Sequence, residues 1–203
     1  LILINNYKIM KVKEIFDLGL KMGIKADPRG QKGVNEYLVQ IKKEFENLPT
    51  KEKKYFDKNR LDNPYIDSQI HVDDGKTEVK RVLTGIDIGD GEIILASQLG
   101  ERDKKIDLVM AHHPVGYSLA HLHTVMEMQI EFFVKAGVPV HIAEKIMEER
   151  MSEVGRSVHP VNHYRLTDMA KLLKVNLINT HTITDNLVTE YLENFLQKRK
   201  PKY

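Results

Sequence analysis

The sequence contains no cysteine among its 203 residues. This absence excludes disulfide bonds, and it also excludes any metal site built on thiolates. A metal ion bound by this chain would have to use imidazole and carboxylate ligands, which suit Zn, Mn, Fe, Ni or Co. The 9 histidines are therefore the first candidates for metal ligands.

Long hydrophobic segments and an excess of charge of one sign are also missing. The apolar runs, such as residues 93–96, fall far short of the roughly 20 residues that span a bilayer. The opening run, residues 1–4, is too short for the core of a signal peptide. We therefore predict a cytoplasmic protein. The formal net charge is only +2, which gives no reason to expect a nucleic-acid or anionic-membrane surface.

The chain is predicted to form one domain with a helical beginning. Residues 1–9 precede Met10, which looks like a more natural start, so we interpret them as added sequence or as an early start. Residues 10–64 carry helical hydrophobic stripes that Pro49 interrupts. Residues 65–203 are predicted to form a mixed α/β part of the same domain, and this part carries the candidate metal site.

Short apolar or alternating runs predict four strands, at residues 65–72, 79–88, 106–111 and 175–180. The turn signal at residues 73–76 predicts that the second strand forms an antiparallel hairpin with the first. Helices are predicted between and after the later strands, at residues 92–99, 124–136, 139–154, 160–173 and 186–198. Parallel neighbours need such crossovers. We therefore expect an α/β fold with a four-stranded mixed sheet, its first strand antiparallel, covered by helices.

The third predicted strand ends in two adjacent histidines, His112 and His113, followed by Pro114. In open α/β sheets, ligands bind just beyond the carboxyl ends of the strands. Neighbouring strand side chains point to opposite faces, so this pair is better placed to reach two ions than to grip one. Pro114 keeps His113 out of the helical region.

The last predicted strand also ends in a histidine, His181, and Asp185 follows at the expected start of a helix. A carboxylate has two oxygens and can bridge two cations about 3.5–4 Å apart. We therefore predict His112, His113 and Asp185 as metal ligands. Two alternatives remain open: Asp185 could cap the last helix in a capping box with Thr182, and the two adjacent histidines could form a hydrogen-bonded structural pair.

Other histidines are secondary candidates: His121, His123 and His163. Glu127 lies four residues after His123, but its spacing from Thr124 also fits a capping box, which we take as its role.

Three segments resemble the Nif-three-like family, whose members are often described as GTP cyclohydrolase 1 type 2 homologues. Residues 110–114, Met-Ala-His-His-Pro, are similar to the T-H-H-P strand end of that family. Residues 181–186, His-Thr-Ile-Thr-Asp-Asn, are similar to its H-T-x-x-D-N segment, and residues 85–87 to its G-x-D strand end. The order and spacing of the three agree, and together they cover roughly residues 80–190.

The resemblance implies two α-β-(β-α)₃ repeats with mixed sheets, assembled into a toroidal homohexamer. The strand pattern above corresponds to one such repeat. By match, His112, His113 and Asp185 carry over as ligands of two divalent ions, and His181 as a residue near the site. The His and Glu that the family takes from its second repeat have no counterpart here. Either the chain is a fragment of a longer protein, or substitutes for these two ligands come from elsewhere in it, such as the three secondary histidines.

The functional expectation is a metal-dependent hydrolase that acts on a nucleotide-like or phosphorylated small molecule, with His181 as a proton carrier. The alternative is a non-catalytic metal-binding scaffold or regulatory oligomer. The basic stretches at residues 51–60 and 198–202 are interpreted as solvated faces rather than as a nucleic-acid surface.

Overall fold

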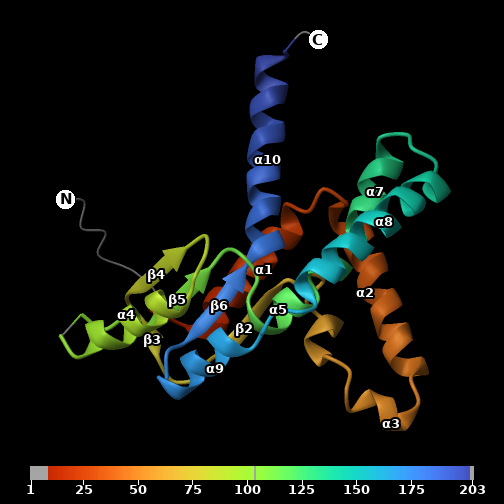
Figure 1. The fold of residues 1–203 in the computed structure, drawn as a ribbon. Helices are drawn as coiled ribbons and strands as arrows, with labels where there is room; N and C mark the ends of the chain where they lie inside the picture. Colours follow the sequence, from red (N-terminus) through yellow and green to blue (C-terminus); the bar gives the residue numbers. More distant parts are fainter. Residues whose placement is uncertain (1–8, 103, 202–203) are drawn as a thin grey trace.

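Four strands form one mixed sheet in the computed structural model, which describes residues 9–102 and 104–201. They are β2 (Ser68–Val72), β4 (Val82–Gly85), β5 (Leu108–Ala111) and β6 (Leu177–Thr180), in the order β2-β6-β5-β4. Strands β4, β5 and β6 are parallel, whereas β2 runs antiparallel to β6. The predicted four-stranded mixed sheet with an antiparallel first strand is confirmed (Figure 1).

The predicted hairpin between the first two strands is wrong. Strands β2 and β4 are the two outer strands of the sheet and do not touch. Strand β2 pairs instead with β6, whose four residues are all buried. The turn itself forms, with the Asp74 carboxylate accepting the backbone N–H groups of Lys76 and Thr77. It leads into β3 (Glu78–Val79), which pairs with β1 (Met10–Lys11) in a separate two-stranded sheet.

The predicted strand over residues 79–88 is also split in two. Lys80 and Arg81 donate their backbone N–H groups to the Asp107 carboxylate at 3.0 and 2.9 Å instead of to a neighbouring strand. The Asp107 side chain therefore interrupts the predicted strand and separates β3 from β4.

Helices cover both faces of the sheet, as the continuous apolar sequence of β5 requires. On one face, β5 and β6 pack against α4 (Asp90–Gly100) and α9 (Arg165–Leu172). On the other face they pack against α1 (Val12–Lys25) and the start of α10 (His181–Arg199). Successive β5 residues serve the two cores in turn, with Val109 in the first and Leu108 in the second, and each such buried side chain contributes about 1.5–3 kcal/mol.

The remaining helical segments are α2 (Gly30–Asn47), α3 (Thr50–Lys53), η1 (Lys58–Leu61), α5 (Gly116–Ala120), α6 (Leu122–Val125), α7 (Met128–Lys135) and α8 (Val140–Val158). Helices α7 and α8 pack on each other to one side of the sheet (Figure 1). Helix α7 contacts the turn before α2, where Arg29 Nη1 lies 3.8 Å from Glu131 Oε1 and Lys135 donates to the Pro28 carbonyl. None of the described helices is both long and apolar enough to cross a membrane.

Several predicted helix boundaries are wrong. The helix predicted over residues 186–198 begins earlier, since α10 starts at His181. The predicted helix over 124–136 is interrupted after α6, and the capping box with Glu127 does not form, because the Thr124 hydroxyl donates to the His121 carbonyl at 2.8 Å. Helix α8 continues past Gly155 to Val158. Pro160 does not open a helix, since α9 begins only at Arg165. Residues 1–8, most of the predicted start segment, lie outside the described residues.

Helix α1 lies against the first turns of α10, and the contact is closest at Gly23. A Cβ atom on Gly23 would lie 3.0 Å from both the Cα and the carbonyl oxygen of Ile183. Gly19, one turn earlier on the same face, has more room, because a Cβ there would lie 3.6 Å from Ile183 Cγ2. Gly23 therefore lets the two helix backbones approach each other.

We predict that Gly23→Ala destabilises the protein by about 1–3 kcal/mol, because the added methyl group would push α10 away from α1. Urea unfolding measures the change in the free energy of unfolding. Gly19→Ala is the matched control, and its gain in helix propensity should leave stability unchanged or raise it by up to about 1 kcal/mol. Equal destabilisation by both substitutions would contradict close packing at Gly23.

Candidate metal centre

The fold brings polar side chains from all four strands to one edge of the sheet. His112 and His113 follow β5, His181 follows β6, and Asp87 follows the end of β4. Strand β2 runs in the opposite direction, so the residue before it, Asp67, lies at the same edge. The carboxyl ends of the parallel strands thus carry the cluster, as expected for an open α/β sheet.

The paired histidines are held by backbone hydrogen bonds that extend the β4–β5 pairing. The His112 N–H donates to the Gly85 carbonyl, and the His113 N–H donates to the Ile86 carbonyl, both at 2.9 Å. The chain therefore stays beside β4 for two residues after β5 ends.

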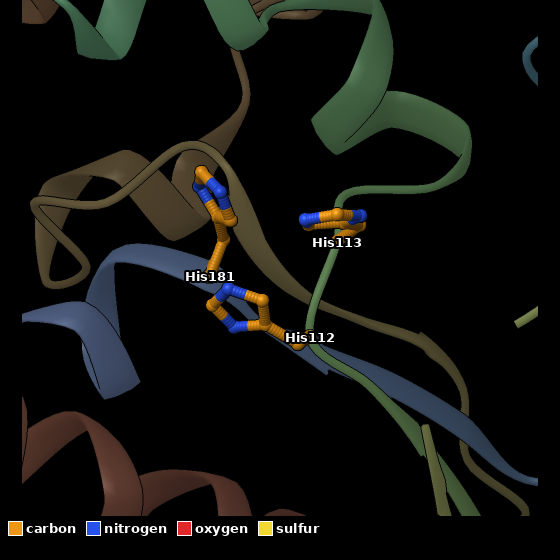
Figure 2. A group of neighbouring side chains, drawn as sticks. All are labelled: His112, His113 and His181. Carbon is orange, nitrogen blue, oxygen red and sulfur yellow. The ribbon is translucent and has the colours of Figure 1, made fainter. Parts of the chain in front are cut away.

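The structure brings three imidazole rings together at this edge. One ring nitrogen each from His112, His113 and His181 lies within 4.8 Å of the other two. The ring centre of His112 is 5.2 Å from that of His113 and 5.0 Å from that of His181 (Figure 2). The sequence-predicted pair therefore shares one centre with His181, the residue predicted from sequence only as a near-site group.

Carboxylates hold the Nδ1 atoms of two of these rings. Nδ1 of His181 lies 2.8 Å from Asp67 Oδ2, and Nδ1 of His113 lies 2.6 Å from Asp87 Oδ1. A carboxylate only accepts hydrogen bonds, so Nδ1 carries the proton in both rings. In the neutral ring, Nε2 then holds the free lone pair.

The third ring is oriented by a hydroxyl group. Nδ1 of His112 lies 3.0 Å from Thr184 Oγ1. The Thr184 hydroxyl also contacts the carbonyls of Thr180 and His181, which take its single proton. Its oxygen is thus left to accept from His112, and Nε2 is again the free nitrogen. Ligating histidines commonly donate their second N–H to such a partner, which fixes the tautomer and the ring orientation.

Asp67 is the buried carboxylate that organises this edge, with no exposed surface. Besides His181, it accepts hydrogen bonds from the Thr182 hydroxyl at 2.6 Å and from the Ser68 hydroxyl at 3.3 Å. Burial lowers the pKa of His181, but the hydrogen bond and charge of Asp67, together with the charge of Asp185, outweigh burial and raise this pKa above its usual value. Asp67 thus stabilises positive charge on His181.

Asp185 lies in the second turn of α10, 52% exposed, with its carboxylate toward two of the rings. Oδ1 is 3.5 Å from Nε2 of His112, and Oδ2 is 3.8 Å from Nε2 of His181. The capping-box alternative is wrong, because α10 already begins at His181 and the Thr182 hydroxyl binds Asp67. Asp185 is therefore a half-exposed carboxylate beside two of the rings, one helical turn after His181.

The secondary histidines have separate environments. Nδ1 of His121 lies 3.0 Å from the Tyr117 carbonyl, and Nε2 of His163 lies 2.8 Å from the Val158 carbonyl. His123 packs near Gly155. None of the three belongs to the cluster that the described residues form around His112.

His71, which no sequence pattern singles out, links β2 to β6 just before the histidine cluster. His71 Nε2 lies 2.8 Å from the side-chain oxygen of Asn179, which also accepts from Ser118. Burial lowers the pKa of His71 to about 4, so the ring stays neutral near pH 7 and donates to Asn179.

Neither a protein-family model nor a curated protein sequence matches this chain. A solved structure does match, the crystal structure of a NIF3 superfamily protein from Sphaerobacter thermophilus, with a TM-score of 0.63 and 23% sequence identity. The chain has the NIF3 fold. The NIF3 match covers 95% of this chain and 56% of the solved one, so the chain spans little more than half the length of that protein. The likeness concerns the fold, which agrees with the fold implied by the resemblance of the three motifs.

We predict that Asp67→Asn lowers the pKa of His181, measured by NMR titration of its ring protons in chelator-treated protein. In the unaltered protein the raised pKa stabilises the fold below the unfolded-state value of about 6.5, and this contribution is lost as pH rises through the folded-state pKa. The Asp67→Asn variant should lose most of this dependence of stability on pH.

Asp185→Asn is the control, and it should lower the His181 pKa by less, because only the more distant charge is removed. A His181 pKa that stays the same or rises in Asp67→Asn would contradict the role of Asp67.

Proposed function

We propose that this chain is a divalent-metal-binding protein of the Nif-three-like family whose metal centre supports hydrolysis of a phosphorylated or nucleotide-like small molecule. One observation carries the proposal. Three imidazoles meet at the sheet edge, and each has Nδ1 engaged by a protein group, which leaves the Nε2 lone pair available to a metal ion.

The donor set fits a borderline divalent cation such as Zn, Mn, Fe, Ni or Co. His112, His113 and His181 would hold one ion, and the Asp185 carboxylate would supply oxygen ligands to a second ion beside it. Three protein ligands leave a coordination position for water, as in catalytic sites. A bound ion would lower the pKa of that water toward 7 and polarise the substrate.

The surrounding residues act on the ligands. Asp67 and Asp87 hold His181 and His113 in the tautomer that exposes Nε2. A ring bonded through both nitrogens has no site for a further proton. We therefore propose His181 as a ligand in place of the proton carrier predicted from the sequence. Asp185, half-exposed beside the cluster, is the carboxylate within reach of a substrate.

We predict that the full chain binds Mn²⁺ in a calorimetric titration. His113→Ala should either reduce the number of ions bound or weaken the affinity about 10- to 100-fold. His121→Ala is the matched control and should leave binding unchanged, because His121 bonds to the Tyr117 carbonyl outside the cluster. Equal weakening by both variants, or none by His113→Ala, would overturn the site.

Turnover of phosphate esters by the same samples separates the enzyme from the scaffold. An enzyme should lose turnover on treatment with chelator and in Asp185→Ala. Stoichiometric metal without turnover over a broad ester panel would support the non-catalytic scaffold, and hydrolysis that survives Asp185→Ala would overturn the proposed role of that carboxylate.

Self-association, which we predict from the family resemblance, is supported by the outer half of α10. This half projects away from the sheet (Figure 1) and exposes an apolar stripe at helical spacing. The stripe consists of Val188, Tyr191, Leu192, Phe195 and Leu196. Glu190 and Glu193 lie at its near end, with Lys198 and Arg199 beyond it. An antiparallel α10 from a second copy would set acidic turns beside basic ones, so we propose a second copy as the partner.

We predict that Leu192→Glu, at a side chain that is 50% exposed, shifts the full chain toward monomer in sedimentation velocity. The reason is that the new charge would be buried between the paired helices. Gln197→Glu adds the same charge on the opposite side of the helix and should leave the assembly unchanged. A monomeric unaltered chain at tens of micromolar would contradict the pairing.

A further inference from the structure

A cavity of about 740 Å³ lies directly beside the metal centre and shares His181 and Asp185 with it. Its opposite wall is apolar and comes from α6, α7, α8 and the segment between α6 and α7. The wall consists of Leu122, Val125, Met126, Met128, Phe132 and Val154. A volume of this size suits a small organic ligand, and apolar walls with polar groups at one end are typical of such sites.

The two walls are linked by a polar network that is buried around Asp27 and reaches α7 through a half-exposed glutamate. The Asp27 carboxylate accepts from Arg29 at 2.9 Å and from the Tyr65 hydroxyl at 2.7 Å, and Asn186 of α10 donates to that hydroxyl at 3.1 Å. Arg29 in turn lies 3.8 Å from Glu131 of α7. The apolar wall on α7 and the polar wall on α10 are therefore anchored to the same group, and the cavity is preformed.

The charges around the cavity disfavour a polyanion in its body. Asp67, Asp185 and Glu193 line it, whereas the cationic residue among its described lining side chains is Lys135. Lys135 already donates to the Pro28 carbonyl. Outside the metal centre, a triphosphate chain would thus meet apolar side chains or carboxylates.

We propose, resting on the metal-dependent hydrolysis above, that the cavity holds the uncharged aromatic body of a phosphate monoester whose single phosphoryl group reaches the metal centre. Methionine thioethers and a phenylalanine ring favour a flat aromatic group. In the reaction, a water oxygen forms a bond to phosphorus and the bond from phosphorus to the aryl oxygen breaks. The aryl alcohol leaves with a proton, and inorganic phosphate is the second product.

The binding test uses 1-naphthol, the uncharged body of such an ester, with the full chain. We expect saturable binding, and in the Mn²⁺-loaded protein the naphthol proton signals should broaden because the ion is near. Phe132→Ala should weaken binding about five- to tenfold. Phe133→Ala is the matched control, since Phe133 is the neighbouring ring on the same helix and does not line the cavity, and it should stay within about twofold.

A second variant, Met126→Gln, tests the wall without removing volume and should weaken naphthol binding as well. Unchanged Mn²⁺ affinity in both wall variants would show that the metal centre is intact. With turnover as the readout, 1-naphthyl phosphate should have a kcat/KM at least about tenfold above those of ethyl phosphate and ATP.

The outcomes separate this inference from the function on which it rests. Mn²⁺ binding without naphthol binding, or equal weakening by Phe132→Ala and Phe133→Ala, overturns the cavity assignment and leaves the metal site standing. Naphthol binding without Mn²⁺ uptake overturns the metal-dependent function and leaves the cavity. A preference for ATP over 1-naphthyl phosphate overturns the substrate class.

Discussion

The burial of one carboxylate, Asp67, is the constraint on which the rest of the site depends. A carboxylate with no exposed surface must find all of its hydrogen bonds within the protein. Asp67 finds them in Ser68, Thr182 and His181, and its backbone carbonyl accepts from the Asn179 side chain at 2.5 Å. These partners join the start of β2 to the end of β6 and the first turn of α10. The position of His181 at the sheet edge follows from that junction.

A second buried group fixes α10 one turn further along. Asn186 donates to the Tyr65 hydroxyl and to the Gly23 carbonyl at 3.1 and 3.2 Å. Burial, with the charge of Asp27, raises the pKa of Tyr65 far above its usual value, so its hydroxyl keeps its proton and donates to Asp27 permanently. Helix α10 is therefore held at residues 182 and 186, and His181 and Asp185, which precede these anchors, turn to the open side.

Much of the fold followed from local sequence, and the site followed in part. The apolar run of β5 and the histidines after it predicted a strand end with ligands, because parallel strands present their carboxyl ends at one edge. The hairpin failed because the choice of a β-strand partner is made by the whole sheet, and the buried β6 took the place beside β2. Asp67 was missed because a single carboxylate within the strand predicted over residues 65–72 carries no motif. The orientation of each ring depends on distant residues such as Thr184 and Asp87, whose positions only the folded chain defines.

Helix α10 has a mechanical consequence for the molecule. Its 19 residues form one continuous rod about 28 Å long, with no break between the turns that carry His181 and Asp185 and the exposed apolar stripe. Because Asp67 and the Gly23 carbonyl hold the inner turns at Thr182 and Asn186, any partner that packs on the stripe would be held at a fixed position relative to the histidine cluster.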